Sequence, residues 1–206
     1  MTKKHAFLLL TLHAVFLSGC VMLKTYEARP LPPGIQTTLR SYQAGGALGD
    51  AIRESRVLAE HYQHKLAPVL IEMHQSAKIV GQDKQSRLLA QARGQTASMT
   101  VIAGKVRSSW LRYQTSIAGA GGEKAMAAEI GLRLSERCLS LLDRTRRMLD
   151  LTEGYIRAGV EKNLSYLSPG NQRQFNREMT ALDAASVALL SEYEALVAAL
   201  QNLRRH

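Results

Sequence analysis

A row of large apolar residues that repeats every seven positions near the C-terminal end constrains this chain more than any other feature. Its five members are Phe175, Leu182, Leu189, Leu196 and Leu203. A second row follows four positions later: Met179, Ser186, Tyr193 and Leu200. Alternating three- and four-residue spacing places both rows on one face of an α-helix, as in helices that pack against each other along their length. We therefore predict a helix over about 171–203.

Three earlier stretches have the same seven-residue period, over about 50–80, 84–117 and 123–167. Pro68 lies inside the first, where its missing N–H and its ring should kink or split the helix. Three glycines at 119–122 end the second stretch. Before the last stretch, Ser168 can cap a helix that has Pro169 at its first position.

The composition supports helices rather than strands. Hydrophobic residues make up 46% of the chain, mostly as Ala and Leu, and aromatic residues only 5%. Ala and Leu favour helix, whereas strands favour β-branched and aromatic residues. Short turns between long helices imply antiparallel neighbours. The predicted fold is all-α, an elongated up-and-down antiparallel bundle of about four long heptad-patterned helices.

The N-terminus has the layout of a secretory signal peptide. Lys3 and Lys4 precede an apolar run over 6–17, which is followed by small residues and a cysteine. A bilayer-spanning helix needs about 20 apolar residues, and this run is shorter. The sequence therefore predicts a cleaved export signal rather than a permanent membrane-spanning anchor.

Leu17-Ser18-Gly19-Cys20 resembles the lipobox of bacterial lipoproteins. The resemblance implies cleavage before Cys20, a diacylglyceryl thioether on its sulfur and an acylated amine. Val21, in place of Asp, implies passage to the outer membrane. The expected domains are a signal peptide over 1–19, a lipidated N-terminus with a Pro- and Gly-rich tether over 20–49, and a helical bundle over 50–206.

If Cys20 carries lipid, Cys138 is the one remaining cysteine and cannot form an internal disulfide. Its spacing from Leu134 and Leu141 places it beside the apolar stripe of the third helix. We expect a buried, unreactive thiol. An intermolecular disulfide is the competing hypothesis, because the periplasm is oxidising.

Two patterns raise the question of catalysis. Glu54-Ser55 resembles the catalytic pair of lytic transglycosylases, but the Gly-Leu-Met-Gln stretch that follows it in that family is missing here. His61, His64 and His74 cluster on the first helix without a cysteine or paired acid to complete a metal site. We expect neither a metal nor another cofactor, and no enzymatic activity.

Charged residues are distributed unevenly along the chain. The chain carries a net charge of +10, and residues 84–122 hold six basic residues and no acidic one. On a helical wheel the predicted stripe lies on the solvent side, away from the apolar rows: Lys84, Arg87, Lys105 and Arg112. Such a stripe attracts anions. The competing interpretation is a solvated face, or one neutralised by acids on neighbouring helices.

A second set of basic residues lies on the third helix: Arg133, Arg137, Arg144 and Arg147. Acidic residues run alongside it at three- and four-residue offsets: Glu129, Glu136, Asp143 and Asp150. Pairing of the two sets on a solvated face is expected in preference to anion binding.

Three hypotheses for function follow. The first is a lipid-tethered, non-catalytic scaffold on the periplasmic face of the outer membrane, with a periplasmic or outer-membrane protein as its partner. The second is a binding module for anionic envelope components such as peptidoglycan, lipopolysaccharide or anionic lipid. The third is a murein-cleaving enzyme. Nucleic acid is not an expected partner of an exported protein.

Overall fold

The computed structural model describes residues 31–76, 82–160 and 168–204. Its elements are α2 (Pro33–Ser41), α3 (Gly46–His61), the π-helical turn Tyr62–Leu66, α4 (Ala67–Ser76), α5 (Gln82–Ser116), α6 (Glu123–Val160) and α7 (Pro169–Leu203). These ranges contain no strand. The chain is therefore all-α, as predicted.

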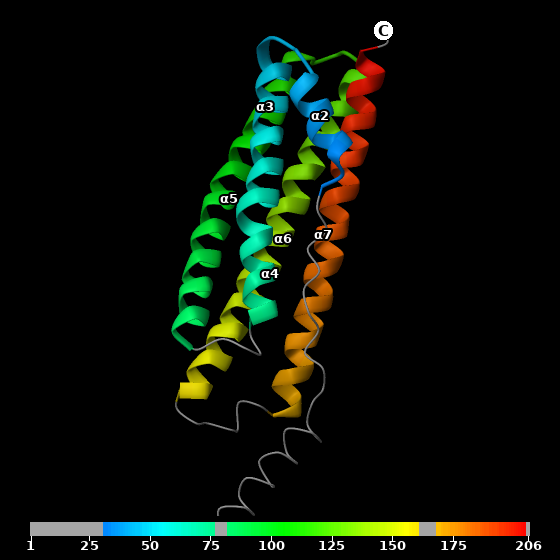
Figure 1. The fold of residues 1–206 in the computed structure, drawn as a ribbon. Helices are drawn as coiled ribbons and strands as arrows, with labels where there is room; N and C mark the ends of the chain where they lie inside the picture. Colours follow the sequence, from blue (N-terminus) through cyan, green and yellow to red (C-terminus); the bar gives the residue numbers. More distant parts are fainter. Residues whose placement is uncertain (1–30, 77–81, 161–167, 205–206) are drawn as a thin grey trace, which may run out of the picture.

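Four long columns run alternately down and up in Figure 1: α3 with α4, then α5, α6 and α7. α5 packs against α3, α4 and α6, and α6 packs against α7. Thirty-five residues of helix, the length of α5 and of α7, extend about 50 Å. The predicted elongated up-and-down bundle is confirmed.

The heptad rows form the core. In α7 the first four members of the leading row and all of the second row are buried. The fifth member, Leu203, is partly buried against the core at the end of the helix. The two predicted rows of the second stretch end at Tyr113 and Ile117. Ile117, just beyond α5, is partly buried, and the other members are buried: Ala92, Thr96, Met99, Ala103, Val106, Trp110 and Tyr113. Seven-residue spacing therefore identified the inward face of these helices.

Pro68 produces the predicted split of the first long helix. A π-helical turn, Tyr62–Leu66, separates α3 from α4 just before the proline. There the Ala67 N–H bonds to the Tyr62 carbonyl, five residues back. Because the proline ring would clash with the His64 carbonyl in a regular helix, the extra residue of the π turn relieves the conflict.

The expected tether needs correction at its C-terminal end. We predicted a spacer over 20–49, but α2 forms within it and α3 begins at Gly46. Pro33 occupies the first turn of α2, where a missing N–H does no harm. Ile35 and Leu39 are buried, and α2 packs against α3 and α7. The packed part of the chain therefore already includes Leu31, well before residue 50.

The start of α7 agrees with the cap predicted from the sequence. The Ser168 hydroxyl accepts a hydrogen bond from the Asn171 N–H at 3.4 Å, and Pro169 follows it in the first turn of α7. The predicted extension of the third helix beyond Val160 falls on 161–167, outside the described residues.

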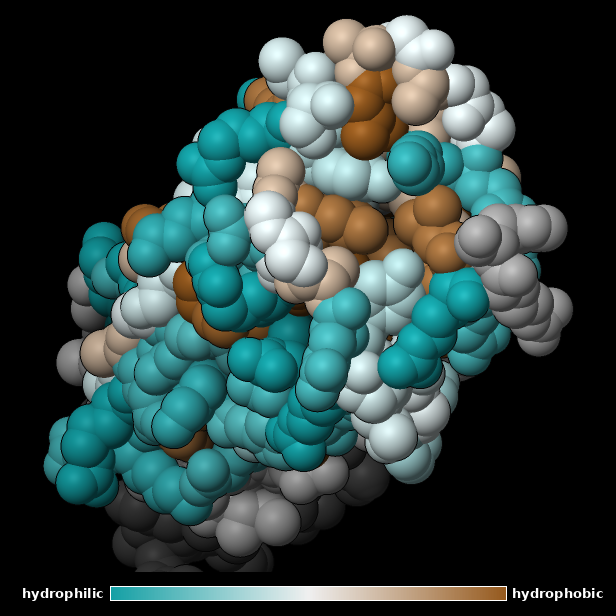
Figure 2. All heavy atoms as spheres, turned by 90° about the horizontal axis from the view of Figure 1, so that it is seen from above, coloured by the Kyte–Doolittle hydropathy of each residue, from teal (hydrophilic) through white to brown (hydrophobic). Residues whose placement is uncertain are grey.

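The upper end of the bundle joins α2, the start of α3 and the end of α7. Figure 2 shows this end from above, with apolar residues gathered near the centre and hydrophilic ones around them. Tyr42, Leu48 and Ile117 are among the partly buried residues that pack on the core. Arg204 donates a hydrogen bond to the Ser41 carbonyl at 3.3 Å and lies over the Tyr42 ring, so the end of α7 holds the end of α2.

Candidate functional site

The predicted basic stripe lies on the outside of α5, and three of its four members form no ion pair with the described residues. Arg87, Lys105 and Arg112 are exposed, and we call these three the basic edge. In the described part of the chain, no ion pair engages them. Lys84 differs, because its ammonium group pairs with Glu72 of α4 at 2.9 Å. The basic edge therefore stops short of the start of α5.

An open groove of about 520 Å³ runs beside the basic edge, between α3 and α5. Lys105 and Arg112 line it together with Glu54 of α3. Four further residues of α5 complete the lining: Val101, Gly104, Ser108 and Ser109. Arg112 donates a hydrogen bond to the Ser109 hydroxyl at 3.0 Å, which leaves other guanidinium donors open to solvent. This surface can hold a carboxylate or phosphate group between two cations.

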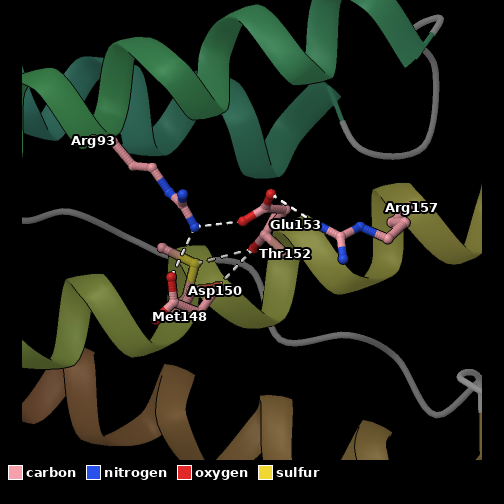
Figure 3. Close-up of polar contacts among 6 residues, drawn as sticks. All are labelled: Arg93, Met148, Asp150, Thr152, Glu153 and Arg157. Carbon is pink, nitrogen blue, oxygen red and sulfur yellow. Dashed lines mark hydrogen bonds and ion pairs between the residues drawn. The ribbon is translucent and has the colours of Figure 1, made fainter.

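Arg93 shows how a basic residue of α5 is neutralised elsewhere. Its guanidinium contacts Asp150 at 2.8 Å and Glu153 at 2.6 Å, both on α6, and Glu153 also pairs with Arg157 at 3.3 Å (Figure 3). The α6 side of α5 is therefore a charge-paired interface. The basic edge, on the α3 side, has no such acids paired with it.

All four arginines of the α6 set are paired, but only two of them with the predicted acids of their own helix; Arg137 and Arg144 pair with acids of α7. Arg133 pairs with Glu129 at 2.7 Å, and Arg147 with Asp143 at 2.6 Å. Glu192 of α7 lies 3.4 Å from Arg133, and Glu178 lies 3.3 Å from Arg144. The two pairs within α6 are exposed and each contributes little stability, whereas the α7 glutamates are partly buried. Together these pairs remove the arginines as an anion-binding set.

The Glu54-Ser55 pair is divided between two environments. Ser55 is buried; its hydroxyl donates to the Ala51 carbonyl at 2.8 Å and accepts from the Trp110 indole N–H at 2.9 Å. The Tyr193 hydroxyl donates to the Ser55 carbonyl at 3.1 Å, and burial raises the pKa of Tyr193 well above its usual value. Glu54 points to the open groove instead. Ser55 is thus a packing residue that links three helices.

The three histidines do not converge. The His61 ring bonds to the Gln95 carbonyl at 3.3 Å, His64 is exposed, and the His74 ring bonds to the Leu70 carbonyl at 2.6 Å. Burial lowers the pKa of His74. No group of three or more potential ligands suited to a metal ion occurs among the residues that the structure describes.

Cys138 is fully buried, in agreement with the prediction. Burial raises the pKa of its thiol to about 12, so the nucleophilic thiolate is scarce at neutral pH. Cys20, the predicted lipid attachment site, lies outside the described residues.

Gly131 is a packing residue that sequence reasoning missed. A Cβ atom on it would lie 2.1 Å from the Trp110 ring, so α6 approaches the indole with only hydrogen at that position. The signal in the sequence was a glycine in the middle of an otherwise strong helical pattern. Its meaning depended on which residue of α5 lies opposite.

Comparisons with family models, with curated proteins and with solved structures find no match for this chain. Among the described helices, none combines the length and the apolar character needed to cross a bilayer. The functional argument therefore depends on the chain's own residues.

Proposed function

We propose that this protein is an outer-membrane-tethered periplasmic lipoprotein that acts as a non-catalytic interaction protein. The lipid on Cys20 would hold the bundle at the membrane, and the bundle would present its long helical faces to a protein partner. The observation that carries the proposal is the short link between the lipobox cysteine and the folded body. Ten residues, 21–30, separate Cys20 from the buried Leu31.

That link limits where the bundle can work. Ten residues reach at most about 35 Å when fully extended. The anchored bundle, about 50 Å long, would therefore remain close to the membrane surface. A partner would be a membrane protein or a periplasmic protein that is recruited to the membrane.

A second candidate function is a binding module for anionic envelope components. The basic edge and the adjoining groove support it, because Lys105 and Arg112 line the groove with a single acidic residue, Glu54, and form no ion pair within the described ranges. Phosphate groups of lipopolysaccharide and carboxylates of peptidoglycan are the anions that such a surface would meet in the envelope.

The murein-cleaving alternative gains less support. A glycosidase general acid typically lies in an enclosed, apolar site that keeps it protonated. Glu54 instead lies on an open groove that also contains Lys105 and Arg112. We therefore keep catalysis outside the proposal.

Crosslinking in cells, followed by purification of the protein, separates the two candidates. The proposal predicts covalent adducts with a defined protein, reduced in Cys20→Ser because that variant is no longer held at the membrane. Adducts with glycan or lipopolysaccharide in place of protein would favour the anion-binding module. Equal yields of the same protein adduct from wild type and Cys20→Ser would contradict a role for the tether.

A further inference from the structure

The outward face of α5 carries a heptad row of its own, apart from the core rows, that no described element of the bundle covers. Its eight members, which we call the outer row, are all exposed: Ala90, Gly94, Ala97, Val101, Gly104, Ser108, Leu111 and Thr115. They alternate at three- and four-residue spacing, as the core rows do. In Figure 1, α5 lies at the edge of the bundle, with α3 in front. The row therefore has the period of a helix-packing seam but faces solvent.

Two observations show that the outer row differs from an ordinary polar surface. Val101 and Leu111 are 62% and 43% exposed, whereas α3, α6 and α7 each expose one large apolar side chain among their described residues: Val57, Met126 and Val187. Between Ala90 and Thr115 no member of the row is charged, although Arg87 continues the same spacing toward the start of α5. Helix faces that remain in water usually carry charged and polar residues.

Among the residues that the structure describes, nothing packs closely against the glycines of the outer row. Cβ atoms built on Gly94 and Gly104 meet nothing within 4 Å, whereas a Cβ on Gly131 would collide with Trp110. Glycine weakens a helix interior relative to alanine, so its presence calls for a close approach. No residue in the described ranges makes that approach at these two positions. A second helix backbone that packs against the row would make it.

The charges around the row decide which helix that would be. The basic edge borders the row on the α3 side, and Arg107 is exposed on its other side. A second copy of this chain would bring two basic surfaces together, which opposes association. A helix with acidic residues beside its own apolar seam would pair with them instead.

We infer that the outer row and the basic edge of α5 form the docking surface for a helix of a partner protein, one with a small or apolar heptad seam flanked by Asp and Glu. This inference deepens the proposed function and rests on it, since it names the surface and the partner's chemistry. The seam supplies close packing, and Lys105 and Arg112 supply orientation and selectivity.

Site-specific photocrosslinking of the full-length chain in cells tests the inference. A benzophenone amino acid replaces Ala97, Val101 or Ser108 in turn, and Ala184 or Ser191 on the exposed side of α7 serve as controls. We expect protein adducts from the three outer-row positions and not from the controls. Peptide mass spectrometry should place the captured residue in a segment with three- and four-residue apolar spacing and flanking acids.

Two variants separate docking from folding. Gly94→Ala with Gly104→Ala should raise the melting temperature, because both methyl groups enter open space, and yet should reduce adduct formation by about fivefold or more, because the partner backbone can no longer approach. Lys105→Glu with Arg112→Glu should reduce adduct yield by about fivefold or more. Arg173→Glu with Arg177→Glu, on α7, is the matched control and should leave the yield unchanged.

Several results would overturn the inference. An adduct of twice the chain's own mass would show that a second copy covers the row. Lipid or glycan adducts alone, or unchanged yields in both variants, would show that no acidic helix docks there. Protein adducts from α7 without any from α5 would refute the surface while the proposed function stands; absence of protein adducts from every position would contradict both.

Discussion

The substitution Gly131→Ala gives the most specific test of how the bundle is packed. Its Cβ would lie 2.1, 2.2 and 2.6 Å from three atoms of the Trp110 ring. Ordinary van der Waals contact begins near 3.4 Å, so the ring or the α6 backbone would have to move by about 1.3 Å. Trp110 is fully buried, and its indole N–H is bonded to Ser55. The ring therefore has little freedom to retreat.

The size of the effect follows from three contributions. Overpacking of a core costs about 1–3 kcal/mol. Loss of the Trp110–Ser55 hydrogen bond adds about 1 kcal/mol. Replacing glycine by alanine inside a helix stabilises the helix by about 1 kcal/mol. We expect a net loss of about 2 kcal/mol in the free energy of unfolding. For a bundle of this size, that corresponds to a melting temperature about 6 °C lower.

Gly104→Ala is the matched control, because it makes the same chemical change in a long helix where the new methyl group meets nothing within 4 Å. It should stabilise the protein by about 0.5–1 kcal/mol. Urea unfolding followed by far-UV circular dichroism measures both variants, and near-UV dichroism reports the Trp110 environment. A Gly131→Ala protein as stable as wild type, with an unchanged near-UV spectrum, would refute the packing described here. In a Trp110→Phe background, the Gly131→Ala substitution should cost less than it does alone.

Three further predictions address the core and its ionisable groups. Leu189→Asp places an unpaired carboxylate at a fully buried position and should cost several kcal/mol; wild-type thermal stability would mean that this row faces water. In a soluble form that starts at Val21, Cys138 should react with a thiol reagent only after unfolding, and rapid labelling of the native protein, or a dimer band on a non-reducing gel, would contradict its burial. Burial lowers the pKa of His74 in the folded state, so its contribution to stability should be full above the unfolded-state pKa of about 6.5 and should decline as the pH falls below that value. The variant His74→Gln should weaken that decline. An identical pH dependence of stability in the variant would show that another group is responsible.

The long helices and their inward faces could be predicted because the information is local and periodic. The α7 rows and the Ser168–Pro169 start require no knowledge of neighbouring helices. Pro68 likewise acts on its own helix, so a break was predictable, although its π-helical form was not.

α2 could not be placed from composition alone. The prolines before residue 34 indicated an extended spacer, yet Pro33 begins a helix that is stabilised by contacts with α7, far away in the sequence. The spacing of Leu31, Ile35 and Leu39 was the available signal, since one apolar residue per turn marks a helix face. Tertiary packing decided between the two readings.

The candidate site was predictable to a similar degree. Exposure of Arg87, Lys105 and Arg112 followed from the helical wheel. The pairing of Lys84 with Glu72 did not, because it depends on how α4 and α5 lie side by side. The groove and the open space above Gly94 and Gly104 also required coordinates, since a sequence does not show which glycines lack neighbours.

Mass spectrometry of the mature protein purified from membranes tests the central claim most directly, because the lipid tether is what places the bundle where a partner could meet it. We expect an N-terminal peptide that begins at Cys20 and carries a diacylglyceryl thioether together with an acylated amine, and we expect this peptide to be absent in Cys20→Ser. A mature chain that begins elsewhere, or one that begins at Cys20 with an unmodified thiol and amine, would contradict that claim.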